Sequence, residues 1–140
     1  MIQTCEAVAE GHALGIVHRN LRPTTLVATR RYDGPSRVKV FDFGAAEALH
    51  FDPLTDGGLS LIGTNAILSS VPYMAPEQIR DPYDVDARVD VYALGAILHE
   101  LLSGAPAITG QNGPALLAAA VADAPVALRT LREDVPAELE

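Results

Sequence analysis

Apolar residues recur every three or four positions in two stretches of the chain, which is the spacing of one face of an α-helix. The longer pattern starts near Asp86, ends at Gly104 and carries an apolar stripe of Val91, Leu94, Leu98, Leu101 and Leu102. The other pattern covers residues 1–14, where the expected buried face consists of Ile2, Cys5, Ala9 and Ala13. Gly15 should end this helix, and a shorter helix is predicted for residues 114–121.

Two short apolar runs separated by turn residues predict a β-hairpin. The runs cover residues 26–29 and 38–41, and turn-forming residues lie between them. The polar segment 18–23 should be a loop, because it ends in a proline that lacks a backbone donor. The pattern therefore predicts an α+β fold that is mainly α-helical, with a small hairpin beside a loop. After the hairpin, about thirty residues show no firm periodicity, and ordered loops of that length are usually functional.

Composition narrows the class of protein. The chain has 140 residues, of which 49% are hydrophobic, so it is one domain or part of one and can bury a core. A formal net charge of -8 disfavours a nucleic-acid binder, because no basic stripe is available to displace counterions from phosphates. The single cysteine, Cys5, allows no internal disulfide and no cysteine-based zinc cluster, and we expect it to pack in the core.

No part of the sequence resembles a targeting or membrane segment. The N-terminal residues are not a basic stretch followed by an apolar run, as a secretory signal requires. An uninterrupted apolar stretch of the ~18 residues that a membrane span needs is also missing. We therefore expect a cytoplasmic protein.

Four ordered segments carry a resemblance to a known family. They are GIVHRNLRPTTL at residues 15–26, VKVFDFGAAE at 38–47, VPYMAPEQI at 71–79 and DARVDVYALGAILHELLSG at 86–104. They resemble the catalytic loop, the metal-binding segment, the end of the activation segment and the central helix of the large lobe in bacterial eukaryotic-like serine/threonine protein kinases. One such match alone is weak, but four in this order are specific. The resemblance implies the large, C-terminal lobe of a protein kinase fold.

The resemblance implies a phosphoryl-transfer site that uses ATP and magnesium, although this chain departs from the family pattern there. Asp42 matches the aspartate that holds magnesium; the alternative is a carboxylate that caps a turn. Asn20 stands where the family has the aspartate that accepts the substrate proton, and Thr25 stands where an asparagine binds a second magnesium. Arg22 replaces the lysine that contacts the transferred phosphate, and it keeps the charge but changes the geometry.

Other matched residues have supporting roles in the family. His18 and Phe43 should pack beneath the loop, Gly44 should permit a backbone bend, and Asp90 should hydrogen-bond the backbone of the catalytic loop. A further matched residue, Glu77, would pair with an arginine that we expect beyond residue 140.

The resemblance also implies a regulatory contact and a substrate groove. Arg19 would pair with a phosphate on Thr64 in the activation segment, the alternative being that Thr64 is an ordinary loop threonine. Ser70 keeps the hydroxyl that the family places in its substrate groove, whereas Ser69 replaces a glycine there.

Residues 1–140 should therefore form a partial kinase domain. The expected domain runs from the helix before the catalytic loop to just after the helix that follows the central helix, without a small lobe. No glycine-rich phosphate loop precedes the match, so another chain could supply the small lobe. The favoured function is a catalytically impaired, pseudokinase-type binding or regulatory module with a protein partner. The alternatives are a serine/threonine kinase completed by a missing small lobe, and a truncated gene product without function.

Overall fold

A computed structural model describes residues 1–30, 32, 34–43, 68–122 and 124–139. The helices are α1 (Ile2–Ala13), α5 (Pro76–Arg80), α6 (Arg88–Ser103), α7 (Gly113–Ala122) and α8 (Leu128–Leu131). Short 3₁₀ helices cover Pro23–Thr25, Val71–Tyr73 and Ala137–Leu139. The strands are β1 (Leu26–Thr29) and β2 (Arg37–Val40). The fold is mainly helical with one small sheet, as predicted.

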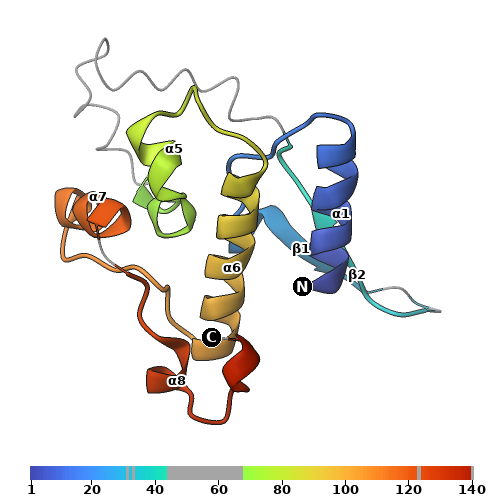
Figure 1. The fold of residues 1–140 in the computed structure, drawn as a ribbon. Helices are drawn as coiled ribbons and strands as arrows, with labels where there is room; N and C mark the ends of the chain where they lie inside the picture. Colours follow the sequence, from blue (N-terminus) through green and yellow to red (C-terminus); the bar gives the residue numbers. More distant parts are fainter. Residues whose placement is uncertain (31, 33, 44–67, 123, 140) are drawn as a thin grey trace.

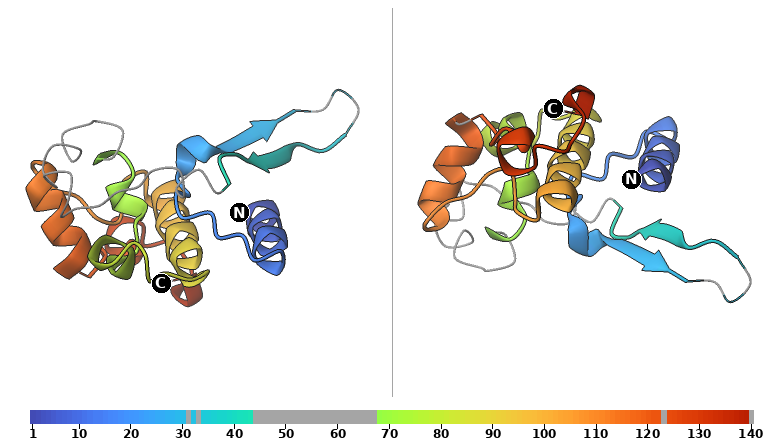
Figure 2. Two further views of the ribbon diagram at one scale, coloured as in Figure 1. Left: turned by 90° about the horizontal axis from the view of Figure 1, so that it is seen from above. Right: turned by 90° about the horizontal axis from the view of Figure 1, so that it is seen from below.

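Helix α6 runs through the middle of the molecule, with α1 and the hairpin on one side and α5 and α7 on the other (Figure 1). The views along the perpendicular direction show the same separation, with the hairpin projecting away from the helices (Figure 2). Strands β1 and β2 are antiparallel, and their register places Leu26 opposite Val40 and Thr29 opposite Arg37. The predicted hairpin is confirmed, with its second strand displaced by one residue.

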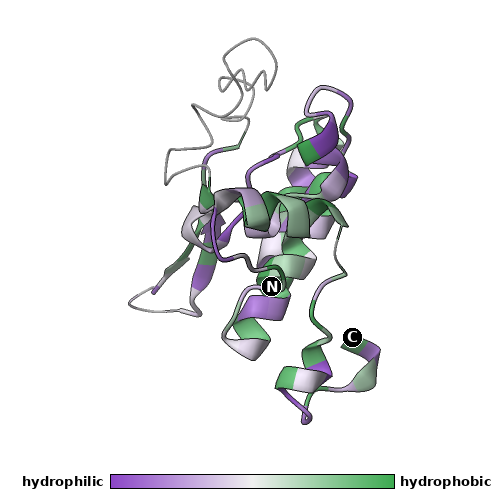
Figure 3. Cartoon of the chain, turned by 90° about the vertical axis from the view of Figure 1, so that its left-hand side faces the viewer, coloured by the Kyte–Doolittle hydropathy of each residue, from purple (hydrophilic) through white to green (hydrophobic). Residues whose placement is uncertain are grey.

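Two small hydrophobic clusters lie on the two sides of α6. The first consists of Val8, Leu21, Ala93 and Ile97, and joins α1, the loop and α6. The second consists of Val71, Ile108 and Ala120, and is packed by partly buried residues of α5 and α7. Helix α7 is apolar along its whole sequence, which Figure 3 shows as hydrophobic colouring on the side of the molecule that faces the viewer. The core is therefore divided, and α6 connects its parts.

The predicted buried face of α1 is wrong. Thr4 and Val8 are the buried residues of this helix, whereas Ile2 is 78% exposed and Cys5 is also exposed. The reason is that polar contacts orient α1. Gln3 accepts a hydrogen bond from the backbone N–H of Val38 at 2.8 Å, and this contact turns the side of the helix that carries Gln3 toward β2.

The boundaries of α6 were predicted well, but its buried stripe was not. Gly104 ends the helix with φ of 79°, a left-handed conformation that glycine adopts without steric cost. The buried residues are Val89, Asp90, Ala93, Ala96 and Ile97, while Val91 and Leu101 are 61% and 63% exposed. The small residues let neighbouring segments approach α6 closely, and a count of large apolar residues misses that face.

Candidate functional site

Asp90, in the first turn of α6, anchors the loop that follows α1. Its Oδ2 accepts a hydrogen bond from the backbone N–H of His18 at 2.8 Å, and its Oδ1 accepts one from the N–H of Arg19 at 2.8 Å. The imidazole of His12 donates from Nε2 to Oδ2 at 2.7 Å. Asp90 is fully buried, so these donors satisfy a carboxylate that would otherwise be costly to bury. The scaffold contact that the family resemblance implies for Asp90 is present.

His12 is a member of this anchor that sequence reasoning missed. It lies in the last turn of α1. Nothing in the local sequence distinguishes it from a surface histidine. Only the tertiary fold brings it to Asp90, 78 residues away in the sequence.

Arg19 has an unusual backbone conformation that two side chains hold in place. Its φ is 64°, in the left-handed region that non-glycine residues rarely adopt. Asp90 binds its N–H, and the side-chain amide of Gln78 on α5 donates to its carbonyl oxygen at 2.6 Å. The loop therefore takes its shape from α5 and α6 rather than from local preference.

His18 connects the loop to the end of the hairpin. The ring is buried, and its Nε2 donates to the carbonyl oxygen of Phe41 at 2.8 Å. Its Nδ1 accepts a hydrogen bond from the backbone N–H of Asn20 at 3.3 Å. These partners assign the proton to Nε2, because a carbonyl can only accept and an N–H can only donate. The ring also packs on Phe43, with 4.7 Å between the ring centroids. His18 and Phe43 thus have the packing positions that the resemblance implies.

This arrangement brings Asn20 and Asp42 to opposite sides of one histidine ring. Asn20 bonds to the ring through its backbone, and Asp42 follows Phe41, which accepts the other hydrogen bond. Asp42 is exposed and has φ of 65°, also in the left-handed region. The predicted proton-acceptor position and the predicted metal-binding position are therefore joined through His18.

Thr25 and Arg22 form a closed turn. The Thr25 hydroxyl donates to the carbonyl oxygen of Arg22 at 2.9 Å and accepts from its N–H at 3.2 Å. Thr25 is 1% exposed, so its hydroxyl is used within its own turn. A metal-ligand role for Thr25 stays a prediction, and it would need a different side-chain arrangement.

Arg22 also reaches across to the segment that precedes Val71. Its Nη1 donates to the hydroxyl of Ser69 at 2.8 Å. Next to this contact lies a hollow of about 260 Å³, lined by Arg22, Pro23, Thr24, Ser69, Tyr73 and Glu100. Ser70, the predicted substrate-groove residue, is buried beside Ser69. The predicted loop and the predicted groove residues thus meet at one place.

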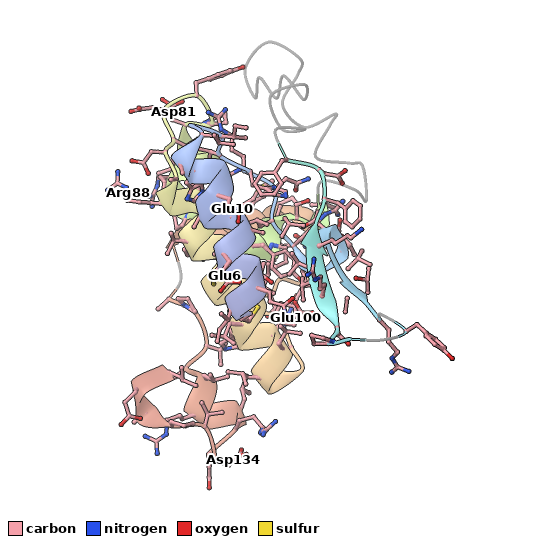
Figure 4. The ribbon with its side chains drawn as sticks, turned by 90° about the vertical axis from the view of Figure 1, so that its right-hand side faces the viewer. Glu6, Glu10, Asp81, Arg88, Glu100 and Asp134 are labelled. Carbon is pink, nitrogen blue, oxygen red and sulfur yellow. The ribbon has the colours of Figure 1, made fainter. Side chains whose placement is uncertain are left out.

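Tyr73 and Glu100 are two lining residues that the sequence did not indicate. Glu100 comes from α6 (Figure 4) and accepts a hydrogen bond from the Tyr73 hydroxyl. Burial raises the pKa of Tyr73 well above its usual range, and the hydrogen bond to Glu100 and its negative charge add to this effect. The hollow therefore combines a neutral phenol with one positive and one negative side chain.

For three other predicted residues the structure gives no contact that bears on the predicted role. Thr64 and Gly44 lie outside the described residues. Glu77 lies on α5 and is exposed. The regulatory pairing of Arg19 with a phosphate on Thr64 stays a prediction.

Within the described ranges, no group of three or more histidine, cysteine, aspartate or glutamate side chains is placed to hold a metal ion. Of the two predicted metal ligands, Asp42 is exposed, and its carboxylate is a suitable magnesium ligand. Across the same part of the chain, no helix is both long enough and apolar enough to cross a membrane.

Comparison with known proteins supports the resemblance to protein kinases. The family model for the protein kinase domain matches residues 1–138. The chain belongs to the bacterial serine/threonine protein kinase family. The serine/threonine-protein kinase PknB of Mycolicibacterium smegmatis is 37% identical over 136 residues, and that of Mycobacterium tuberculosis is 35% identical over 136 residues. The probable PknB of Corynebacterium glutamicum is 35% identical over 112 residues.

The kinase match covers nearly all of this chain but little of its relatives. The alignment with the Mycolicibacterium kinase covers 97% of this chain and 20% of the relative, and the Corynebacterium alignment covers 80% and 16%. The family resemblance predicted from the four segments is therefore confirmed. What the whole relatives do is not thereby established for this chain.

Proposed function

We propose that this chain is the large-lobe part of a serine/threonine kinase domain that is catalytically impaired and acts as a pseudokinase-type binding or regulatory module. The observation that carries the proposal is Asn20 at the position of the proton acceptor. Its amide is neutral and has no useful basicity near neutral pH. A positioned general base contributes roughly 10²- to 10⁴-fold to a rate, so its replacement should leave at most weak transfer.

The loop around Asn20 supports this proposal because several backbone contacts hold it in place among the described residues. Asp90 and Gln78 hold the backbone of Arg19, and His18 holds the backbone of Asn20. The chain thus keeps the contacts that shape the loop while it lacks the carboxylate that would act there. A fold that retains its shape without its reactive group is suited to binding a protein partner.

The nucleotide side of the site gives a mixed result. Asp42 would contribute one carboxylate to a magnesium ion, and Arg22 would contribute positive charge near phosphates. Bound magnesium would neutralise phosphate charge. The Thr25 hydroxyl, however, is bonded within its own turn. ATP and magnesium binding by this chain is therefore part of the alternative rather than of the favoured function.

That alternative is a phosphoryl-transferring serine/threonine kinase whose small lobe comes from elsewhere. The exposed carboxylate of Asp42, at the end of β2, is the observation that favours it. In this case Asn20 would orient the substrate hydroxyl without accepting its proton. The substrate would be a protein serine or threonine.

A thermal melt of the purified chain with and without Mg-ATP separates the two functions. A site saturated at 100 times its dissociation constant would add ~2.7 kcal/mol of stability. We expect a cooperative melt that does not respond to nucleotide, and no response in the matched Asp42→Asn variant. A shift that Asp42→Asn abolishes would favour the enzyme, because it would show that the surroundings of Asp42 still form a nucleotide site.

Restoring the base gives a second measurement. The Asn20→Asp variant is assayed for phosphoryl transfer from ATP to a serine peptide, alone and after addition of a kinase small lobe. The impaired-module proposal predicts no gain. A gain of about 10²-fold or more on addition of the small lobe would support the kinase alternative, because the base and the small lobe would then be the missing parts.

A further inference from the structure

Two departures from the kinase pattern, Arg22 and Ser69, contact each other. The family has a lysine and a glycine at these places, and a glycine offers no side chain to hold the lysine. Here the Arg22 guanidinium donates from Nη1 to the Ser69 hydroxyl at 2.8 Å. The two residues are 47 positions apart, so the contact joins two separate segments of the fold.

We infer that Ser69 is the positioning residue for Arg22. It holds the guanidinium at the wall of the hollow of about 260 Å³, where the loop meets the predicted substrate groove. The two substitutions therefore act as one unit. This inference rests on the proposed function, because the role of position 22 at a phosphate or a protein ligand comes from the kinase family.

The surroundings of Arg22 favour a fixed guanidinium. Its backbone is closed into the turn with Thr25, and its Nε is buried without a hydrogen-bond partner among the described residues. Tyr73 and Glu100 line the same hollow, and the hydrogen bond between them holds these two side chains together. The Ser69 contact adds a hydrogen bond at the outer end of a guanidinium whose Nε is already buried.

The pair has a consequence for the reaction. The position at which the family has a lysine here carries an arginine that Ser69 already binds. Restoring a base at Asn20 would then leave Arg22 tied to Ser69. The hollow instead presents an ordered positive group, a neutral phenol and Glu100 to a protein ligand.

The side-chain N–H signal of Arg22 in a ¹⁵N NMR spectrum tests this inference without any catalysis. The Nη–H signals are assigned by their loss in Arg22→Met, and their exchange with solvent is measured in the unchanged chain and in Ser69→Ala, because the Ser69 hydroxyl bonds Nη1. We expect Ser69→Ala to speed exchange about two- to tenfold, the range for loss of one hydrogen bond. Ser69→Thr keeps a hydroxyl and should preserve the slow exchange.

Two controls make the result specific. Ser36→Ala removes an exposed hydroxyl near β2 and should leave the Arg22 signal unchanged. The backbone amide spectrum reports whether each variant is folded; Ser69 is exposed, so the substitutions should be tolerated. Equal exchange in Ser69→Ala and the unchanged chain, or loss of protection in both Ser69→Ala and Ser69→Thr, would overturn the positioning role. Gain of activity in Asn20→Asp would instead refute the proposed function and leave the NMR result standing.

Discussion

Replacement of Asp90 should be among the most damaging single substitutions in this chain. Asp90→Ala removes the acceptor for the backbone N–H groups of His18 and Arg19 and for the His12 imidazole. A buried donor without a partner costs about 1–3 kcal/mol, and removal of one partner from a buried charged pair costs about 3–5 kcal/mol. Water can reach the two part-buried donors, so we expect a loss of about 3–5 kcal/mol.

This loss is large compared with the stability of a typical domain, which is about 5–15 kcal/mol. Equilibrium unfolding in urea, followed by circular dichroism, measures it directly. With a denaturant dependence of about 1–3 kcal/mol per molar, the midpoint should fall by about 1–5 M. Asp90→Asn should have a smaller effect, because its one oxygen can still accept while its amide nitrogen faces a donor.

Asp86 provides the matched control, since it is an aspartate just before α6 but is exposed and pairs with Arg88. Asp86→Ala should change the urea midpoint far less than Asp90→Ala. Native-state hydrogen exchange adds a local measurement, because the amides of His18 and Arg19 should lose protection even in Asp90→Asn. Equal midpoints for Asp90→Ala and Asp86→Ala would refute the anchoring role of Asp90.

Two further predictions concern other parts of the structure. Because the pKa of Tyr73 is raised, the stability from burying its neutral phenol is fully present below pH ~10 and is lost as pH rises through the folded pKa. In a spectroscopic alkaline titration Glu100→Gln should lower this pKa without returning it to the usual value, since burial is the larger cause; an unchanged titration would contradict the contact. Gly104→Ala should destabilise by about 1–2 kcal/mol because φ is 79°, whereas Gly95→Ala, in open space inside α6, should stabilise by up to about 1 kcal/mol. Urea unfolding of both glycine variants checks the opposite signs, and equal effects would refute the backbone argument.

The sequence predicted the elements of this fold better than the contacts between them. The hairpin, α6, its end at Gly104 and the helix before the loop were all indicated by local patterns. Helix α5 was not predicted, because a five-residue helix is too short to show a period. The faces of α1 and α6 were also wrong, since Gln3 and small residues such as Ala93 decide them.

The residues of the candidate site also fall into two groups, those that the sequence indicated and those that only the structure revealed. Motif spacing indicated His18, Asn20, Asp42 and Asp90, because each stands in a recognisable segment of sequence. His12 lies outside those segments; Gln78, Tyr73 and Glu100 lie inside them, but the motifs assigned them no role, and only the fold brings all four to the loop and the hollow. The Arg22–Ser69 contact is similar, since the sequence shows two unrelated departures and the structure shows that they touch.

The way in which the loop is held has an evolutionary consequence. His18, Arg19 and Asn20 are tied to Asp90, Gln78 and the His18 ring by hydrogen bonds from or to their backbone groups. Those bonds are indifferent to the side chain at position 20. Selection for a folded domain therefore does not protect the residue on which phosphoryl transfer depends. A lineage can exchange aspartate for asparagine there in one step and inherit an intact surface, on which other functions can then be selected.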